Sequence, residues 1–102
     1  MDVKINSSSE IVVYGNIKNV NDYQEIKRIV TEMLREGSGQ LNIKMPDSFS
    51  ITSSIIGYFL KLVYQDGIKL SIMVSDERLF CLMNDLRLTE AFNVQKVTLQ
   101  DM

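Results

Sequence analysis

The sequence predicts an α/β fold: a single domain in which a mixed β-sheet of about five strands packs with three or four helices. Two short β-prone runs open the chain, and helical and strand-like patterns alternate after residue 21. Such alternation favours mainly parallel pairing, with the opening runs adding an antiparallel hairpin. The chain has 102 residues, 45% of them apolar, so we expect one domain spanning residues 1–102.

The first elements are distinguished by their periodicity. Residues 3–5 and 11–14 are rich in Val, Ile and Tyr, and the polar residues 6–10 separate them, which is typical of a hairpin. From Asn21 onward, Asn21 and Gln24 suggest a capping box and Gly37 suggests a helix end. Between them, apolar residues recur at helical spacing: Tyr23, Ile26, Ile29, Val30, Met33 and Leu34.

A second strand and helix follow. Apolar and polar residues alternate over 41–45, which predicts a strand that ends at Pro46, and the loop 46–50 leads to a helix over residues 53–65. Most positions of this helix are apolar, so we expect it to be largely buried. Its polar positions form one narrow stripe, made of Ser54, Tyr58, Lys61 and Gln65.

The last third of the chain repeats this order. Gly67 ends the second helix, residues 68–74 form a strand, and Ser75 with Asp76 and Glu77 begins a third helix that extends to residue 88. A last strand is expected over residues 92–99. One face of the third helix is predicted to be apolar, formed by Leu79, Phe80, Leu82, Met83 and Leu86.

Composition argues against several classes of function. A net charge of -2 disfavours nucleic-acid binding, which normally requires clustered Lys and Arg. The longest apolar run, residues 55–60, is far shorter than the roughly 20 residues that span a bilayer, and no signal peptide opens the chain, so we expect a cytoplasmic protein without membrane insertion. The chain has no His, one Cys and no glycine-rich phosphate loop. We therefore predict no enzyme activity, no cofactor and no metal site.

Two features remain as candidates for chemistry. Cys81 falls opposite the apolar face of the third helix, so we expect it to be exposed, and we assign it no redox role. The hydroxyl cluster Thr52, Ser53 and Ser54 lies where a loop enters a helix. Helix N-termini present unpaired N–H groups and the positive end of the dipole, which suit a phosphate. The competing interpretation is that one of these residues only caps the helix.

Residues 51–57, Ile-Thr-Ser-Ser-Ile-Ile-Gly, resemble the segment that defines STAS domains, which occur in anti-sigma-factor antagonists and sulfate transporters. Other parts of the chain are similar to that family in order and spacing. Residues 13–17 resemble its strand-Gly-strand opening, residues 41–43 its central strand, and residues 69–74 the strand after its signature helix. The likeness continues through residues 76–88 and 92–94, so it covers nearly the whole chain.

The resemblance implies a cytoplasmic regulatory switch that acts by protein–protein binding. In antagonists the signature reads Asp-Ser-Ser-Gly, and its first serine falls on Ser53 here, with Thr52 and Ile55 at the Asp and Gly positions. That serine is phosphorylated by a GHKL-type serine kinase that is also the anti-sigma factor, and a PP2C-type phosphatase removes the phosphate. Ser53 is thus the candidate phosphorylation site, with Ser54 and Thr52 as lesser candidates.

The same resemblance implies a partner-binding surface that includes Thr52, Ser54, Ile55, Gly57, Tyr58 and Lys61. An alternative is a constitutive STAS subunit of a bacterial membrane complex, similar to the small cytoplasmic component of lipid-transport ABC systems. Thr52 and Ile55 are compatible with that alternative. The sequence leaves open the partner's identity and whether the chain is a monomer or a dimer.

Overall fold

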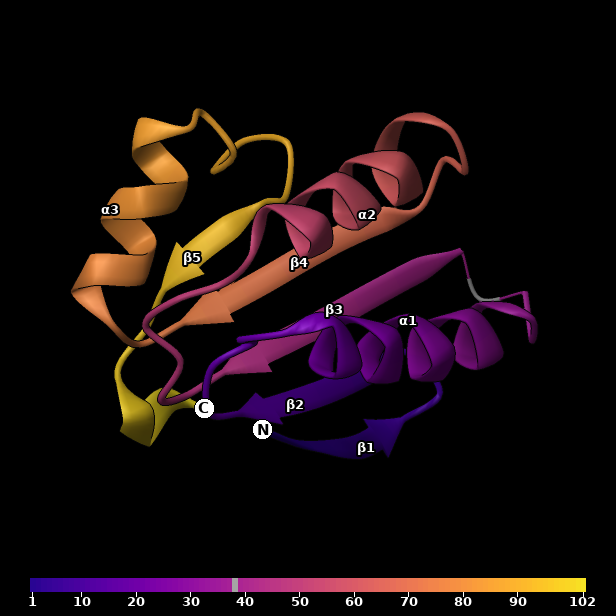
Figure 1. Cartoon of the computed structure of the whole chain (residues 1–102), viewed down its shortest axis with the longest axis horizontal. Helices are drawn as coiled ribbons and strands as arrows, with labels where there is room; N and C mark the ends of the chain where they lie inside the picture. The colour runs from indigo at the N-terminus through magenta and orange to yellow at the C-terminus, as the bar shows by residue number, and fades with distance from the viewer. Residues whose placement is uncertain (38) are drawn as a thin grey trace.

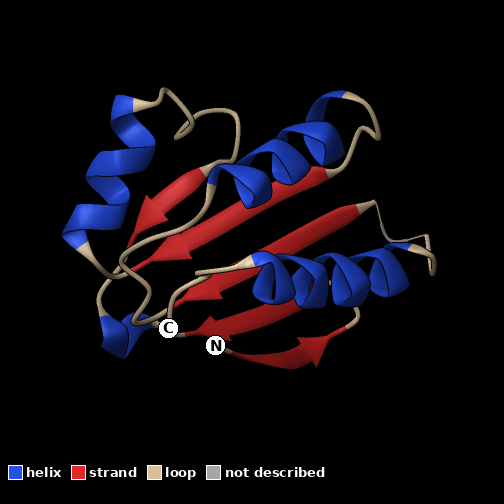
Figure 2. Ribbon diagram, viewed as in Figure 1, coloured by secondary structure: helices blue, strands red, loops and turns tan. Residues whose placement is uncertain are grey.

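A computed structural model describes residues 1–37 and 39–102, and over these residues the chain forms one five-stranded sheet, three α-helices and a short 3-10 helix (Figures 1 and 2). The fold class predicted from the sequence is confirmed. In chain order the elements are β1 (Asp2–Ser7), β2 (Glu10–Tyr14), α1 (Val20–Leu34), β3 (Gln40–Met45), α2 (Ser53–Tyr64), β4 (Lys69–Val74), α3 (Glu77–Asp85), β5 (Val94–Lys96) and η1 (Leu99–Asp101).

The strands lie in the sheet in the order in which they occur along the chain. β1 pairs antiparallel with β2, and β2 to β5 pair in parallel, each parallel pair joined through one of the helices. Because right-handed crossovers that run in one direction all return over the same face of a sheet, α1, α2 and α3 cover one face together (Figure 1). The parallel strands all end at the same edge of the sheet, where their loops lead into the helices.

Burial alternates along the central strands, as one covered face requires. In β3, Leu41, Ile43 and Met45 are buried, whereas Asn42 and Lys44 on the opposite face are half-buried. The same alternation occurs in β4. On that opposite face the Lys44 ammonium donates to the backbone oxygen of Met102 at 3.4 Å, which brings the end of the chain onto the sheet.

The core lies between the sheet and the helices. Phe59 of α2 and Phe92, in the turn before β5, are both almost completely buried, and their rings meet edge to face with centroids 5.8 Å apart. Leu79 and Met83 of α3 and Ile26 and Val30 of α1 join the same apolar cluster. Helix formation here follows from burying these apolar faces more than from intrinsic propensity.

The helix starts differ from the sequence-based expectation in two places. α1 begins at Val20, not Asn21, because Asn19 supplies the cap: its Oδ1 accepts from the Asp22 N–H at 2.9 Å. The Asp22 carboxylate in turn accepts from the N–H of Lys18, the residue before the cap, so the cap lies two residues earlier than predicted. In α3 the cap is Asp76 rather than Ser75, since the Asp76 carboxylate accepts from the Arg78 N–H.

The C-terminal third is shorter in regular structure than predicted. α3 ends at Asp85 instead of residue 88, and Leu82 and Leu86, which the predicted apolar face included, are 37% and 49% exposed. The last strand covers only Val94–Lys96 because Asn93 adopts a left-handed conformation, with φ of 48°, that interrupts extended backbone just before it. After β5 the chain turns into η1 instead of continuing as a strand to residue 99.

The Phe59 and Phe92 contact predicts a large stability effect at one position and a small one at a matched control. Phe59→Ala should lower the free energy of unfolding by about 3–5 kcal/mol, because it leaves a cavity in a packed core. Phe49→Ala, at a side chain that is 45% exposed, should cost about 1 kcal/mol or less. Urea unfolding of the two variants measures both values. Equal losses would contradict this account of the core.

Candidate functional site

The loop that leads into α2 is fixed by the loop that follows β2. Asp47 accepts from the backbone N–H of Gly15 at 2.7 Å, and the buried Ser48 hydroxyl donates to the Gly15 carbonyl at 2.5 Å. Gly15 has φ of +83°, a conformation that favours glycine, and the Met1 backbone lies 3.4 Å from where a β-carbon would stand. Both polar groups of one glycine are thereby used to hold the loop.

A second side chain completes this junction. The Asn16 side-chain oxygen accepts from the backbone N–H groups of Phe49 and Ser50, at 2.8 and 3.2 Å. Asn16, Asp47 and Ser48 therefore position the start of α2, although the sequence analysis singled out none of them. The only signal was the polar composition of two loops, which does not reveal which loop side chain meets which backbone group.

The three neighbouring hydroxyl residues at the start of α2 differ in their structural roles. Thr52 is the N-cap: its backbone is extended, and its Oγ1 accepts from the Ile55 N–H at 3.4 Å. The expectation that one of these residues caps the helix is confirmed for Thr52. Ser53 and Ser54 follow as the first two helical residues, and both are exposed. The hydroxyl of Ser53 is thus accessible at the positive end of a helix.

The remaining predicted site residues separate onto different sides of α2. Ile55 is completely buried in the core, so its side chain is not accessible to a partner. Gly57 and Lys61 are exposed and follow Ser53 at intervals of four residues, which places all three along one face. Ile56 and Leu60 are half-buried beside this face, and Tyr64 at its end is 71% exposed. We call Ser53, Gly57 and Lys61 the exposed ridge.

Tyr58 differs from its predicted place in a polar stripe. It is only 7% exposed and turns toward α1, where its ring meets Tyr23 edge to face, with centroids 6.2 Å apart. Its hydroxyl lies 3.3 Å from the Thr31 hydroxyl. Tyrosine suits this place because its ring can be buried while its hydroxyl reaches a partner. Burial raises the pKa of Tyr58, against the opposing effect of the Thr31 hydrogen bond, so the phenol stays protonated at neutral pH.

A cation–π contact links the start of α3 to the loop before α2. The Arg78 guanidinium contacts both carboxylate oxygens of Asp76, at 3.1 and 2.8 Å, and lies 4.4 Å from the ring centroid of Phe49. The hydrogen bond from the Arg78 side chain lowers the pKa of Asp76 from 3.8 to about 2. Phe49 therefore has a fixed cationic neighbour although its side chain is exposed.

Cys81 is exposed, as predicted. Its thiol donates to the Glu77 carboxylate, with the Sγ to Oε1 distance 3.6 Å. Desolvation and this carboxylate both raise the pKa of the Cys81 thiol, so it is held in the less reactive protonated form. Glu77 also pairs with Lys96 of β5.

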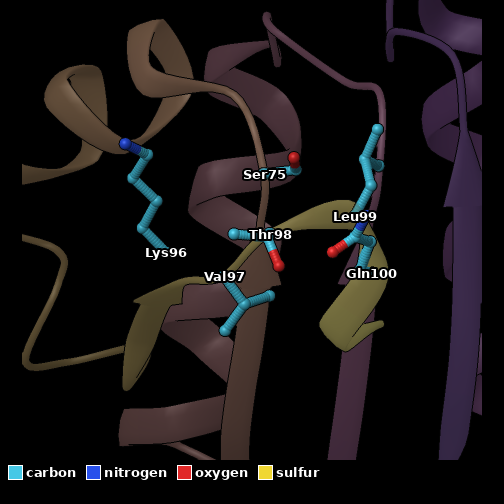
Figure 3. Close-up of a pocket in the computed structure, with 6 residues that line it drawn as sticks. All are labelled: Ser75, Lys96, Val97, Thr98, Leu99 and Gln100. Carbon is cyan, nitrogen blue, oxygen red and sulfur yellow. The ribbon is translucent and has the colours of Figure 1, made fainter.

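A surface pocket of about 580 Å³ lies beside the turn that follows β5, lined by Ser75, Lys96, Thr98 and their neighbours (Figure 3). Its polar groups already have partners in part: Lys96 pairs with Glu77, and the Thr98 hydroxyl donates to Asp101 at 2.9 Å. Figure 3 shows Lys96 extending away from Thr98 and Leu99. Two of the polar side chains that line the pocket are therefore already engaged within the chain.

Residues 1–37 and 39–102 contain no group of three or more His, Cys, Asp or Glu side chains arranged to hold a metal ion. None of the helices in the described part of the chain is long and apolar enough to cross a membrane.

Comparison with known proteins adds no identification. No protein-family model matches the sequence, and no curated protein matches it. The likeness of residues 51–57 to the STAS signature consequently stays a hypothesis about family, while the fold rests on the structure.

The Arg78 contact predicts the acid behaviour of Asp76. In the folded protein Asp76 should titrate near pH 2, and Arg78→Gln should return its pKa toward 3.8, because the charged donor is lost. Since the folded-state pKa is lowered, the stability from this pair is present above pH 3.8 and is lost as pH falls toward 2. Carbon-13 NMR of the Asp76 carboxyl measures this, with Arg28→Gln on α1 as the control. Titration of wild-type Asp76 at its ordinary value would contradict the assignment.

Proposed function

We propose that the chain is a cytoplasmic protein–protein regulatory switch resembling an anti-sigma-factor antagonist, with a binding rather than a catalytic role. One observation carries the proposal: Ser53 is exposed in the first turn of α2, on the same helix face as Gly57. Apart from the residues next to Gly57 and the backbone of α2 itself, no described atom lies within 4 Å of a β-carbon built on Gly57, so packing against the rest of the chain gives no reason for glycine there. A partner backbone approaching the exposed ridge would supply that reason.

The energetics of a phosphate at Ser53 fit a switch. Phosphorylation adds about -1.5 to -2 charges at the positive end of α2, where the first turn consists of two serines and two isoleucines, so the fold should tolerate it. A partner packed on the ridge would instead have to desolvate that charge, which disfavours the complex. We propose a GHKL-type serine kinase, also the anti-sigma factor, as the partner and a PP2C-type phosphatase as the enzyme that reverses the modification.

The half-buried Ile56 and Leu60 support the same surface as a docking face. They flank Gly57 with apolar area that is only partly covered by the chain itself. Apolar contact around a small central residue permits close approach of a second helix or strand. Thr52 contributes indirectly, by capping the helix and holding Ser53 in place.

A second candidate function is a constitutive STAS subunit of a bacterial lipid-transport ABC complex. The residue before Ser53 favours it. That residue is Thr52, whose hydroxyl caps the helix, and the first turn of α2 has no carboxylate that could help engage a kinase. Co-purification with an ATPase and a permease, without phosphate on Ser53, would decide for this function over the switch.

The switch predicts opposite behaviour for two substitutions at one residue. Ser53→Asp should weaken binding to the co-purified kinase about 10-fold or more, because it places a charge in the contact, whereas Ser53→Ala should bind like wild type and no longer accept phosphate. Calorimetry measures the affinities, and mass spectrometry locates the phosphate.

Ser8→Asp is the matched control, since Ser8 is exposed in the hairpin turn between β1 and β2. It should leave the affinity unchanged. If Ser53→Asp and Ser53→Ala bind the kinase equally well, regulation at this turn is wrong.

A further inference from the structure

A groove between α1 and α2 has the properties of a binding site and is distinct from the exposed first turn. It encloses about 440 Å³, within the range of pockets for small molecules, roughly 300–1,000 Å³. Its polar lining comes from both helices and the residues just after them: Lys27 and Thr31 of α1, Arg35 at the C-terminal cap of α1, Tyr58 and Lys61 of α2, and Asp66 just beyond α2.

The charges of this lining are strongly unbalanced. Three of the side chains, Lys27, Arg35 and Lys61, are cationic, whereas Asp66 is the one carboxylate among those that line the groove. Within residues 1–37 and 39–102, neither Lys27 nor Lys61 forms an ion pair with a carboxylate. Arg35 pairs only with Glu32, and both of those side chains are largely exposed. A positive groove therefore lies on a chain whose net charge is -2.

The position of one of these cations is set by aromatic rings. The Lys27 ammonium lies 5.9 Å from the ring centroids of both Tyr23 and Tyr58, and these rings pack edge to face. Two ring faces attract a cation without neutralising its charge. The ammonium is therefore held beside the groove while its charge remains available to a ligand.

The groove lining also contains a hydroxyl proton that is free to donate a hydrogen bond. The Thr31 and Tyr58 hydroxyls lie 3.3 Å apart, and either atom can be the donor. One hydrogen bond between two hydroxyls uses one of their two protons, so the other hydroxyl keeps an O–H that can donate to a ligand. Both hydroxyls line the groove.

We propose that this groove binds the phosphate group of a small soluble phosphate monoester. Lys27 and Lys61 neutralise its charge, Arg35 adds a further cation, and the free hydroxyl of the Thr31 and Tyr58 pair donates to a phosphate oxygen. The site goes beyond the switch at Ser53. Lys61 follows Ser53 by eight residues on α2, about 12 Å along the helix axis, so ligand in the groove need not contact the first turn.

NMR titration of the full chain tests the proposal, with glycerol 3-phosphate and inorganic phosphate as soluble probes and sodium chloride matching ionic strength. We expect saturable shifts in the amides of Thr31, Tyr58 and Lys61, with glycerol 3-phosphate and not with chloride. Cosedimentation with phosphatidylglycerol vesicles forms the third arm. Binding to vesicles without saturable binding of glycerol 3-phosphate would overturn the proposal in favour of a membrane surface.

Variants test which groups hold the phosphate. Lys27→Gln, Lys61→Gln and the double variant Thr31→Val/Tyr58→Phe should each weaken glycerol 3-phosphate binding about 5-fold or more, since each removes a charge or the free hydroxyl donor from the groove. Lys4→Gln is the matched control, because Lys4 is exposed on β1, on the sheet face away from the helices. This placement follows from register: Lys4 is paired with Val12, and Val12 with Lys44 of that face. It should bind like wild type.

The double variant keeps the buried Tyr58 ring and the shape of the Thr31 side chain, and Lys27 and Lys61 are exposed, so all three variants should remain folded. A loss in Lys4→Gln equal to that in Lys27→Gln, or no saturable shift in wild type, would overturn the proposal. Phosphate binding in the groove and kinase binding at Ser53 are measured separately, so either can fail while the other holds.

Discussion

The hydrogen bonds between the β2–α1 loop and the β3–α2 loop fix the place where α2 begins. Gly15 uses both backbone groups on Asp47 and Ser48, and the Asn16 oxygen accepts from two successive N–H groups, Phe49 and Ser50. A helix has a defined phase once its first residue is fixed, since each residue rotates it by a constant angle. The same few bonds therefore decide which residues of α2 face the core, which face α1 and which face solvent.

The residues of α2 therefore lie in three different environments. Ile55, Phe59 and Leu62 pack in the core, Tyr58 meets α1 at the edge of a positive groove, and Ser53, Gly57 and Lys61 form the exposed ridge. The proposed phosphate site uses the side that faces α1. The proposed switch uses the exposed ridge. The switch uses no core side chain, and the phosphate site uses the hydroxyl of Tyr58, whose ring belongs to the core, so substitutions that keep this ring should alter binding more than folding.

Much of the fold follows from periodicity, since strand and helix repeats decide which residues reach a common core. The contacts that shape the site do not follow from it. Asn19 caps α1 in place of Asn21: its side chain accepts from the Asp22 N–H, and the Asp22 carboxylate accepts from the Lys18 N–H. The pattern of polar residues alone allows both caps. Tyr58 turns inward because Thr31 and Tyr23, far away in sequence, accommodate it. Leu82 and Leu86 show the converse: apolar residues at helical spacing that the fold leaves exposed.

The central claim, that a partner approaches the exposed ridge at Gly57, is tested most directly by Gly57→Ala, measured for both stability and partner affinity. Apart from the neighbouring residues and the backbone of α2 itself, no described atom lies within 4 Å of the added carbon, so the free energy of unfolding should rise by about 0.5–1 kcal/mol, as expected for Gly to Ala within a helix. The affinity for the co-purified partner should fall, because the added methyl group occupies the space that the partner needs. A more stable variant that binds the partner as tightly as wild type would contradict the claim.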